Sequence, residues 1–362
     1  MTQETETRPP VSILVVDDSA FMRNALSRML NSDTGLRVVG TAGDGNEALE
    51  KISALDPDVV TLDVEMPGLN GLETLRRIMA QAARPVIMVS SSTVEQAEVT
   101  FSALGAGAFD YVPKQLSSTT LDIFHIRADL IAKIKAAAQS RRSHKANQIP
   151  RKPPRSVVSF EPEPVPVAPA IVAIGTSTGG PQALQQILPL LPADLSVPIL
   201  IVQHLPAGFT APFAQRLNTL CSAPVRESTH HETIQPGTVY IAPAGIHMTV
   251  QRSSDSHAVI CLTPQPEDQL HIPSIDILME SVASEFRSLA MGIILTGMGS
   301  DGVLGMTAIH RQGGFTLGQD EASSLVYGIP RACAEAGILS RVVPLSEIPG
   351  QILQATQYRK RA

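Results

Sequence analysis

The chain has 362 residues, of which 43% are hydrophobic, so it is long and apolar enough to build two cores. Its formal net charge of −6, with no strongly basic half, argues against a nucleic acid as a partner. Three widely spaced cysteines argue against a disulfide framework or a zinc site, and a polar, acidic start without any membrane-length apolar run predicts a cytoplasmic protein.

Short apolar runs alternate with helical patterns over the first part of the chain. Strands are predicted at residues 11–16, 38–40, 59–62, 85–89 and 109–112, and helices at 20–30, 45–55, 71–80, 94–104 and 121–138. The first strand, VSILVV, is apolar throughout, as expected for a parallel strand that is buried on both faces. This alternation predicts a doubly wound α/β domain of the flavodoxin-like type over residues 11–138.

A proline-rich segment then interrupts the pattern, and we predict an interdomain linker over residues 139–168. Beyond it, apolar runs at 171–174, 199–202, 239–241 and 291–295 predict strands again. Two short runs at 249–251 and 259–262 predict a hairpin inserted into that sheet. Residues 169–358 are therefore assigned to a second α/β domain with a Rossmann-like parallel sheet.

Acidic residues follow two strands of the first domain at the point where each strand ends. Asp17 and Asp18 follow the first strand and Asp63 follows the third, so their carboxylates should converge at the carboxyl edge of the sheet. Crowded carboxylates repel one another, and a hard cation such as Mg²⁺ relieves that repulsion through oxygen ligands. Ser90 ends the fourth strand and Lys114 follows the fifth. Together these groups predict a phosphoryl-transfer site with an aspartate as acceptor.

The segments VVDDS, LDVEMPGLNG, PVIMVSS and DYVPK around these residues resemble the response-regulator receiver domains. The resemblance implies that Asp63 is the phosphoacceptor. It implies that the Mg²⁺ site is made by Asp17, Asp18 and Asp63, and that the phosphoryl group is sensed by Ser90, Tyr111 and Lys114. The chain departs from the receiver pattern after the lysine, where Gln115 stands in place of the usual proline.

A glycine-rich turn follows the first strand of the second domain. The strand at 171–174 runs into GTSTGGP, which places Ser177 in the G-x-S-x-G pattern of a nucleophile elbow, ahead of a helix. Free N–H groups and the positive end of that helix would suit an oxyanion. The same pattern fits a plain anion-binding turn equally well, so the pattern alone does not decide between them.

A reactive serine needs a base and a carboxylate that orients the base. His204 follows the strand at 199–202, and Asp301 follows the strand at 291–295, so both should lie at the carboxyl edge near Ser177. Four other histidines are less well placed in loops or helices: His230, His231, His247 and His310. The chain order Ser, His, Asp differs from that of the α/β hydrolases, so we expect a different sheet type.

A dinucleotide-binding turn is a rival interpretation of the segment 297–302. GMGSDG matches G-x-G-x-x-G after a strand, and Asp320 and Glu321 lie about twenty residues further on. Two features count against this rival. Asp301 inside the turn would repel a pyrophosphate, and the turn comes late in the chain rather than at the start of a βαβ unit.

Residues 170 to about 337 resemble the catalytic domain of the chemotaxis protein-glutamate methylesterases. The segments that carry the resemblance are IGTSTGGP, IVQHLP, VYIAPAGIHM, HIPSIDILMES, MGIILTGMGSDG and YGIPRACAEAG. It implies that Ser177 is the nucleophile, His204 the base and Asp301 the residue that orients the base. The backbone N–H groups implied for the oxyanion hole are those of Met298 and Thr178. The role of His271 stays open.

The resemblance also implies a reaction and its partners. The expected enzyme demethylates glutamate γ-methyl esters on chemoreceptors, at the cytoplasmic side of the membrane, and deamidates receptor glutamines in chemotactic adaptation. The ester chemistry needs no cofactor, whereas the receiver needs Mg²⁺ and a chemotaxis histidine kinase as phosphodonor. We expect phosphorylation of Asp63 to activate the enzyme by loosening a receiver that packs over the face of Ser177.

Overall fold

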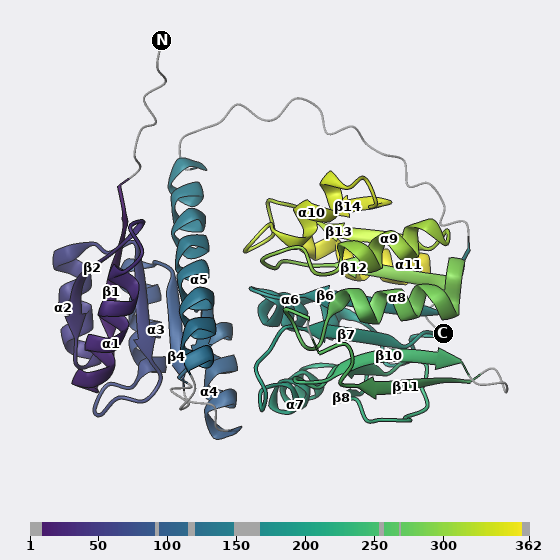
Figure 1. Ribbon diagram of the computed structural model, residues 1–362, viewed down its shortest axis with the longest axis horizontal. Helices are drawn as coiled ribbons and strands as arrows, with labels where there is room; N and C mark the ends of the chain where they lie inside the picture. The colour runs from purple at the N-terminus through teal and green to yellow at the C-terminus, as the bar shows by residue number, and fades with distance from the viewer. Residues whose placement is uncertain are drawn as a thin grey trace, which may run out of the picture. The chain divides into compact units, whose positions relative to one another are not determined.

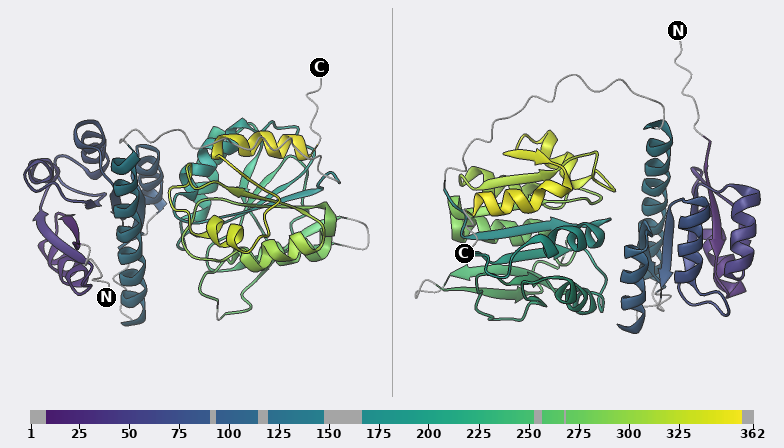
Figure 2. Two further views of the ribbon diagram at one scale, coloured as in Figure 1. Left: turned by 90° about the horizontal axis from the view of Figure 1, so that it is seen from above. Right: turned by 180° about the vertical axis from the view of Figure 1, so that it is seen from behind.

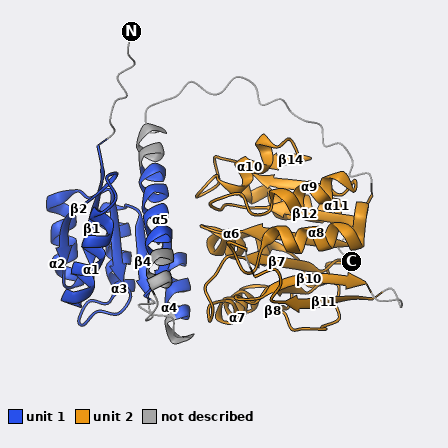
Figure 3. Ribbon diagram, in the orientation of Figure 1, with its two compact units in different colours: residues 1–154 blue, residues 155–362 orange. Residues whose placement is uncertain are grey.

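The computed structural model describes residues 9–90, 94–114, 120–147, 167–252, 257–267 and 269–356. The chain divides into two compact units, residues 1–154 and residues 155–362 (Figure 3). Residues 148–166, which make up most of the predicted linker, lie outside the described residues, as does Gln115. Within the described ranges, no helix is both long and apolar enough to cross a membrane.

The first unit contains a five-stranded parallel sheet in the order β2-β1-β3-β4-β5, with helices between successive strands (Figure 1). The strands are β1 (Val11–Val16), β2 (Leu36–Ala42), β3 (Val59–Asp63), β4 (Val86–Ser90) and β5 (Asp110–Pro113). The helices are α1 (Ala20–Asn31), α2 (Gly45–Leu55), α3 (Gly71–Ala82), α4 (Val94–Gly105) and α5 (Thr120–Asn147). The predicted doubly wound, flavodoxin-like fold is confirmed, and β1 lies beside β3.

Polar caps fix the start of three helices at the same edge of this sheet. Ser19 accepts a hydrogen bond from the N–H of residue 22 at the start of α1, and Asp44 accepts two at the start of α2. The Asn70 side chain accepts one hydrogen bond, from the Glu73 N–H, at the start of α3. Because each cap satisfies backbone donors that a helix leaves unpaired, the loops that follow β1, β2 and β3 end at defined positions. The caps therefore help to fix Asp17 and Asp18 after β1 and Asp63 at the end of β3.

Helix α5 continues beyond its predicted end at residue 138 to Asn147, across the first part of the segment predicted as linker. Arg141 anchors this extension, since its guanidinium lies 2.8 Å from Asp56 Oδ1 and also donates to the Pro57 carbonyl. The buried Arg84 donates to the same two residues. The apolar pattern of α5 fades after residue 138, so these polar contacts, distant in sequence, were invisible to a periodicity argument.

The second unit contains a seven-stranded sheet in the order β14-β13-β12-β6-β7-β9-β8, and all its strand pairs are parallel. The strands are β6 (Ile171–Thr176), β7 (Ile199–Gln203), β8 (Val225–Glu227), β9 (Val239–Ile241), β12 (Ala290–Ile294), β13 (Phe315–Gln319) and β14 (Arg341–Val343). The helices are α6 (Gly180–Ile187), α7 (Thr210–Leu220), α8 (Ile275–Phe286), α9 (Val303–Arg311), α10 (Ile329–Glu335) and α11 (Ile348–Ala355). Three short 3₁₀ helices are η1 (Leu188–Leu190), η2 (Arg287–Leu289) and η3 (Leu345–Glu347). The predicted Rossmann-like parallel sheet is confirmed.

Helices cover both faces of this sheet (Figure 2). Alternate strand residues such as Ala173, Leu200 and Ile294 point to one face, where they form a single core with Met279 of α8 and Met306 of α9. Because the strands are buried on both sides, their apolar runs are nearly continuous, which is why the sequence reveals them.

The predicted hairpin is present, but the prediction that it is inserted into the large sheet is wrong. Strands β10 (His247–Arg252) and β11 (Ala258–Thr263) form a separate two-stranded antiparallel sheet. Val250 and Ile260 belong to the same core as α8, and the Val250 N–H donates to Ser281 Oγ of that helix at 3.1 Å. The hairpin therefore buries its apolar side on α8 instead of extending the large sheet.

Candidate active site and candidate phosphorylation site

Three neighbouring strands at the centre of the large sheet carry the three candidate reactive residues. In the order β12-β6-β7, Ile294 pairs with Gly175, and Thr176 pairs with Gln203. The loops that follow these strands thus start side by side at the carboxyl edge. The Ser177 N–H donates to the carbonyl of the residue at 296 at 3.1 Å, so the serine-bearing loop is tied to the loop after β12.

The structure brings His204 and Asp301 into contact. His204 Nε2 lies 2.8 Å from Asp301 Oδ2, and the two side chains are 9% and 12% exposed. The Nδ1 atom of His204 is buried and has no hydrogen-bond partner among the described residues, so the hydrogen bond from Ser177 to His204 is not formed in this state. An ionised carboxylate holds the ring proton on Nε2, which leaves a lone pair on Nδ1 for a proton from serine. Such bonds often tighten only when substrate is present.

The Asp301 carboxylate is held by the N-terminus of α8. It accepts hydrogen bonds from Ser274 Oγ at 2.8 Å, from the Ile275 N–H at 2.8 Å and from the Asp276 N–H at 3.0 Å. Burial raises the pKa of Asp301, but the hydrogen bond and charge of His204 and the two N–H donors outweigh it and hold that pKa well below its ordinary value. Asp301 therefore stays ionised beside the imidazole.

Asp276 completes a reciprocal arrangement of the two helices. Its Oδ1 accepts from the N–H groups of Gly302 and Gly305, both at 2.8 Å, at the start of α9. Asp301, which precedes α9, therefore caps α8, and Asp276, in the first turn of α8, caps α9. Burial, together with the nearby charge of Asp301, raises the pKa of Asp276 to about 6 against these two donors. Sequence reasoning missed Ser274 and Asp276, although Pro-Ser-Ile-Asp before an apolar run is a helix-start signal.

The candidate oxyanion donors lie on the two loops that meet at Ser177. A Cβ added to Gly297 would fall 2.9 Å from Ser177 Cβ, so the segment that leads to Met298 lies directly on the serine. Neither the Met298 N–H nor the Thr178 N–H donates a hydrogen bond within the part of the chain that the structure describes. Thr178 is buried, and its carbonyl accepts from Thr296 Oγ1 at 2.9 Å. Both N–H groups are thus available to a ligand.

The same geometry weakens the dinucleotide interpretation of the turn at 297–302. A pyrophosphate would need the N–H groups at the start of α9. Those of Gly302 and Gly305 are already bonded to Asp276. Asp301 adds a second ionised carboxylate to this helix start, which would repel a phosphate.

Other histidines contribute packing and hydrogen bonds around this centre. The ring of His271 stacks on that of His204, with centroids 4.1 Å apart and an interplanar angle of 19°. His247 is fully buried; its Nδ1 accepts from the Ser274 N–H at 3.1 Å and its Nε2 lies 3.0 Å from a carbonyl oxygen. Sequence reasoning considered both residues, but it did not reveal that His271 lies against the candidate base.

The first unit gathers its acidic residues at the carboxyl edge, as predicted. Ligand oxygens of Asp17, Asp18 and Asp63 all lie within 4.8 Å of one another, a spacing that fits one divalent cation. Lys114 Nζ lies 2.6 Å from Asp63 Oδ2 and 3.0 Å from Asp17 Oδ2. Burial raises the pKa of Asp63 to about 6, although Lys114 opposes the shift. Burial lowers the pKa of Lys114, but the hydrogen bonds and charges of Asp63 and Asp17 outweigh it and raise that pKa.

The remaining predicted receiver residues contact helix α4. Ser90 Oγ lies 3.1 Å from Thr100 Oγ1, and both residues are fully buried. Tyr111 is buried and meets Phe101 edge to face, with ring centroids 6.5 Å apart. Thr100 and Phe101 are neighbours on α4, so this helix contacts the end of β4 and the aromatic ring on β5 together.

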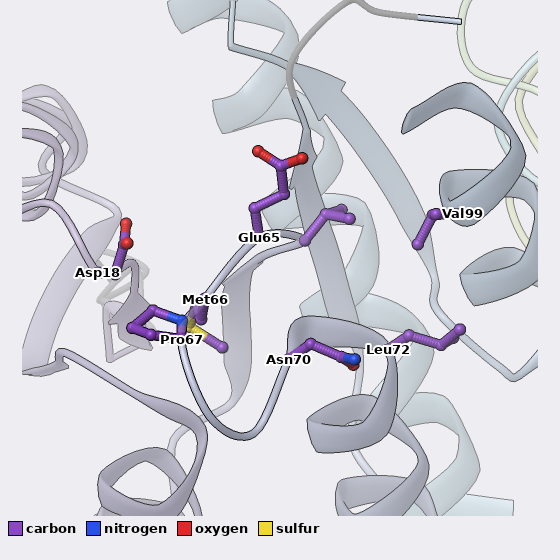
Figure 4. A pocket seen from close by; sticks show the side chains of 8 residues that line it. Asp18, Glu65, Met66, Pro67, Asn70, Leu72 and Val99 are labelled. Atoms are coloured by element: carbon purple, nitrogen blue, oxygen red, sulfur yellow. The ribbon is translucent and has the colours of Figure 1, made fainter. Parts of the chain in front are cut away.

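A pocket of about 540 Å³ opens beside the acidic cluster. Figure 4 shows Asp18, Glu65, Met66 and Val99 around it. Its lining is mainly apolar, with acidic side chains at Asp18 and Glu65. The pocket therefore borders the loop that follows Asp63 with a mainly apolar surface.

Comparisons with known proteins agree with this geometry. Residues 172–352 match the CheB methylesterase family model, and residues 13–123 match the response regulator receiver domain. Fold and site thus define a response regulator whose output domain is a hydrolase. The chain belongs to the protein-glutamate methylesterase/protein-glutamine glutaminase family and is an enzyme of that class.

Its relatives match over nearly their full length. The chain is 46% identical to protein-glutamate methylesterase/protein-glutamine glutaminase 2 of Nitratidesulfovibrio vulgaris, over 95% of this chain and 98% of that protein. It is 43% identical to the protein of the same kind from Halalkalibacterium halodurans, with the same coverage. The crystal structure of the Thermotoga maritima CheB methylesterase catalytic domain matches with 34% identity and a TM-score of 0.50, covering 52% of this chain and 99% of that one. Both resemblances seen in the sequence are confirmed.

Proposed function

We propose that the chain demethylates glutamate γ-methyl esters on chemoreceptors, releasing methanol, and deamidates receptor glutamines to glutamate in chemotactic adaptation. Ser177, His204 and Asp301 carry both reactions. The observation that carries the proposal is the 2.8 Å pair of His204 and Asp301, which lie on the loops after the two strands that flank β6, beside the turn that presents Ser177. Family membership supports the substrate class.

The proposed chemistry uses the atoms as the structure arranges them. Ser177 Oγ attacks the ester carbonyl and its proton passes to His204 Nδ1, while Asp301 stabilises the imidazolium through Nε2. The oxyanion accepts hydrogen bonds from the N–H groups of Met298 and Thr178. When the tetrahedral intermediate collapses, methanol leaves with the proton from His204, and an acyl-enzyme remains. Water then loses a proton to His204 and releases glutamate; from glutamine, ammonia leaves in place of methanol.

We propose that phosphorylation of Asp63 activates the enzyme. A chemotaxis histidine kinase would supply the phosphoryl group, and Asp17, Asp18 and Asp63, whose ligand oxygens lie within 4.8 Å of one another, would hold Mg²⁺. The cation would neutralise charge on the transferring group. The added charge then changes the contacts of Lys114 and of the residues that touch α4, Ser90 and Tyr111.

We also propose the domain division made from the sequence: a receiver at residues 11–138, a linker at 139–168 and a catalytic domain at 169–358. Helix α5, which closes the proposed receiver, runs on to Asn147. That the ester chemistry needs no cofactor, that nucleic acid is not a partner and that the protein is cytoplasmic all stay predictions.

Methanol release from membranes that contain methylated chemoreceptors tests the proposal. The variants are Ser177→Ala and Asp63→Ala, each assayed with and without a small-molecule phosphodonor. A matched control is Asp33→Ala, because Asp33 is an ion-paired carboxylate of the first unit outside the acidic cluster, 2.7 Å from Lys135. We expect Ser177→Ala to be inactive, and Asp63→Ala to be active but insensitive to the donor, which still stimulates wild type and the control. Full activity of Ser177→Ala would show that the nucleophile is misassigned.

A further inference from the structure

The side-chain amide of Gln203, the last residue of β7, lies between the two residues proposed to exchange a proton. Gln203 is 1% exposed. Its Nε2 donates to the Ser177 carbonyl at 2.9 Å and to the His204 carbonyl at 3.0 Å. Since both neighbours are carbonyl oxygens, this end of the amide must be the NH₂ group, and both its hydrogens are used.

The amide continues the connection between β6 and β7 past the end of their backbone ladder. Their register ends where Thr176 pairs with Gln203, and the last backbone bond runs from the His204 N–H to the Thr176 carbonyl at 3.2 Å. Beyond that point the two chains enter separate loops. The Gln203 side chain supplies the next pair of hydrogen bonds, and it does so on the two reactive residues themselves.

Fixing the Ser177 carbonyl also fixes the oxyanion donor. That carbonyl accepts from Gln203 Nε2 and from the Gly180 N–H, which lies 2.8 Å away. The carbonyl of Ser177 and the N–H of Thr178 belong to one planar trans peptide, so they point in opposite directions. Two hydrogen bonds on the carbonyl therefore hold the Thr178 N–H pointing away from Gln203.

The other end of the amide shows that this position is not optimised for stability alone. Gln203 Oε1 is buried and has no hydrogen-bond partner among the described residues. It lies against Gly180, where an added Cβ would come within 1.9 Å of it. A buried oxygen without a donor is unfavourable, and an apolar side chain would avoid that cost. Unlike an apolar side chain, the amide donates two hydrogen bonds to the carbonyls of the two residues proposed to react.

We propose that Gln203 is a positioning residue that holds the Ser177–Thr178 peptide and the His204 backbone in the geometry needed for acylation. This inference rests on the proposed function, because it assumes that Ser177 and His204 react. It adds a residue that no motif argument selected: in sequence, Gln203 is only the residue between a strand and a histidine.

The main test is Gln203→Met in the full chain, which keeps the length of the side chain and removes both donors. We expect kcat for methanol release in the presence of phosphodonor to fall roughly 10- to 100-fold, with KM changed less than about twofold, because positioning acts on the reacting geometry. Labelling of Ser177 by a fluorophosphonate should slow in parallel. The matched control is Thr316→Val, which removes a buried hydrogen bond to the Ile338 carbonyl (2.7 Å) in the same sheet.

The control should lower the Tm without changing kcat. If Gln203→Met keeps wild-type kcat and labelling rate while its Tm falls as in the control, Gln203 is merely structural and the inference is overturned. If Ser177→Ala is still active, the proposed function fails instead, whatever Gln203→Met does.

A second variant covers the case in which Gln203→Met does not fold. Gln203→Glu keeps the shape of the side chain but sets a carboxylate against two carbonyls. Protonation of the introduced carboxyl restores one O–H donor, so the ratio of its kcat to that of wild type should rise as the pH is lowered. Burial raises the pKa of a carboxyl group into the range of about 5 to 8, so a ratio that stays flat across that range would overturn the inference.

Discussion

The substitution Asp301→Asn should abolish most activity because of how the carboxylate is held. Its Oδ2 accepts from His204 Nε2 and the Ile275 N–H, and its Oδ1 accepts from Ser274 Oγ and the Asp276 N–H. An asparagine has one oxygen and one NH₂ group, so in either orientation its NH₂ faces two groups that act as donors in the structure.

We expect the substitution to lower both kcat and the free energy of unfolding. With the NH₂ group toward His204, the imidazole must accept at Nε2 and carry its proton on Nδ1, so it cannot take the proton of Ser177. For a histidine held in the wrong tautomer, kcat falls by roughly 10⁴-fold, or about 5 kcal/mol of barrier. Stability should fall by about 1–3 kcal/mol, since a buried backbone donor of α8 loses its acceptor.

The assay is kcat for methanol release with phosphodonor, alongside calorimetry to confirm that the variant is folded. The matched control is Asp320→Asn, because Asp320 also follows a strand of this sheet and accepts from the Ser323 N–H at 2.9 Å, yet has no contact with His204. The control should keep wild-type kcat. If folded Asp301→Asn retains more than about a tenth of wild-type kcat, Asp301 does not set the tautomer, and the reasoning is refuted.

Three further predictions follow from the same contacts. The pKa of Asp276 is about 6 in the folded chain against an ordinary 3.8, so the folded state binds more protons and stability falls as pH rises from about 4 to 6. Asp276→Asn removes this fall, so its Tm relative to wild type should be higher at pH 7 than at pH 4; an equal difference at both would contradict the shift. Removal of Mg²⁺ with a chelator should abolish stimulation by phosphodonor and leave basal methanol release unchanged; stimulation that survives chelation would exclude a cation at Asp17, Asp18 and Asp63. Gly180→Ala places a Cβ within 1.9 Å of Gln203 Oε1 and should lower kcat by roughly tenfold or more, whereas an unchanged kcat would mean that the amide has room to move.

Much of the fold was predictable because the two large sheets are parallel and buried on both faces. Such strands are short apolar runs, and the run at 11–16 has the same bounds as β1. Residues that follow these runs were expected to meet at one edge, and His204 and Asp301 do meet there, although 97 residues separate them. The rule needs only the strand ends and the parallel topology, both of which are visible in the sequence.

What the sequence did not reveal depends on contacts between distant segments. Ser274 contacts Asp301 across 27 residues, and nothing in a helix-start signal says which side chain the helix will cap. The extension of α5 depends on Arg141 meeting Asp56, 85 residues earlier. The sequence revealed the two strands of the hairpin β10–β11 but not the element that they pack on. An apolar side can be buried on a sheet or, as here, on a helix. Local patterns predict elements, whereas these features belong to tertiary packing.

The pairing of Thr176 with Gln203 also limits how the gene can vary. Side chains alternate along β7, so a one-residue insertion or deletion within it would turn each following side chain to the opposite face of the sheet. The buried amide and His204 would then exchange directions, although every residue type were still present. The number of residues in β7 is therefore constrained together with the identity of His204, because both set which way the reactive ring points.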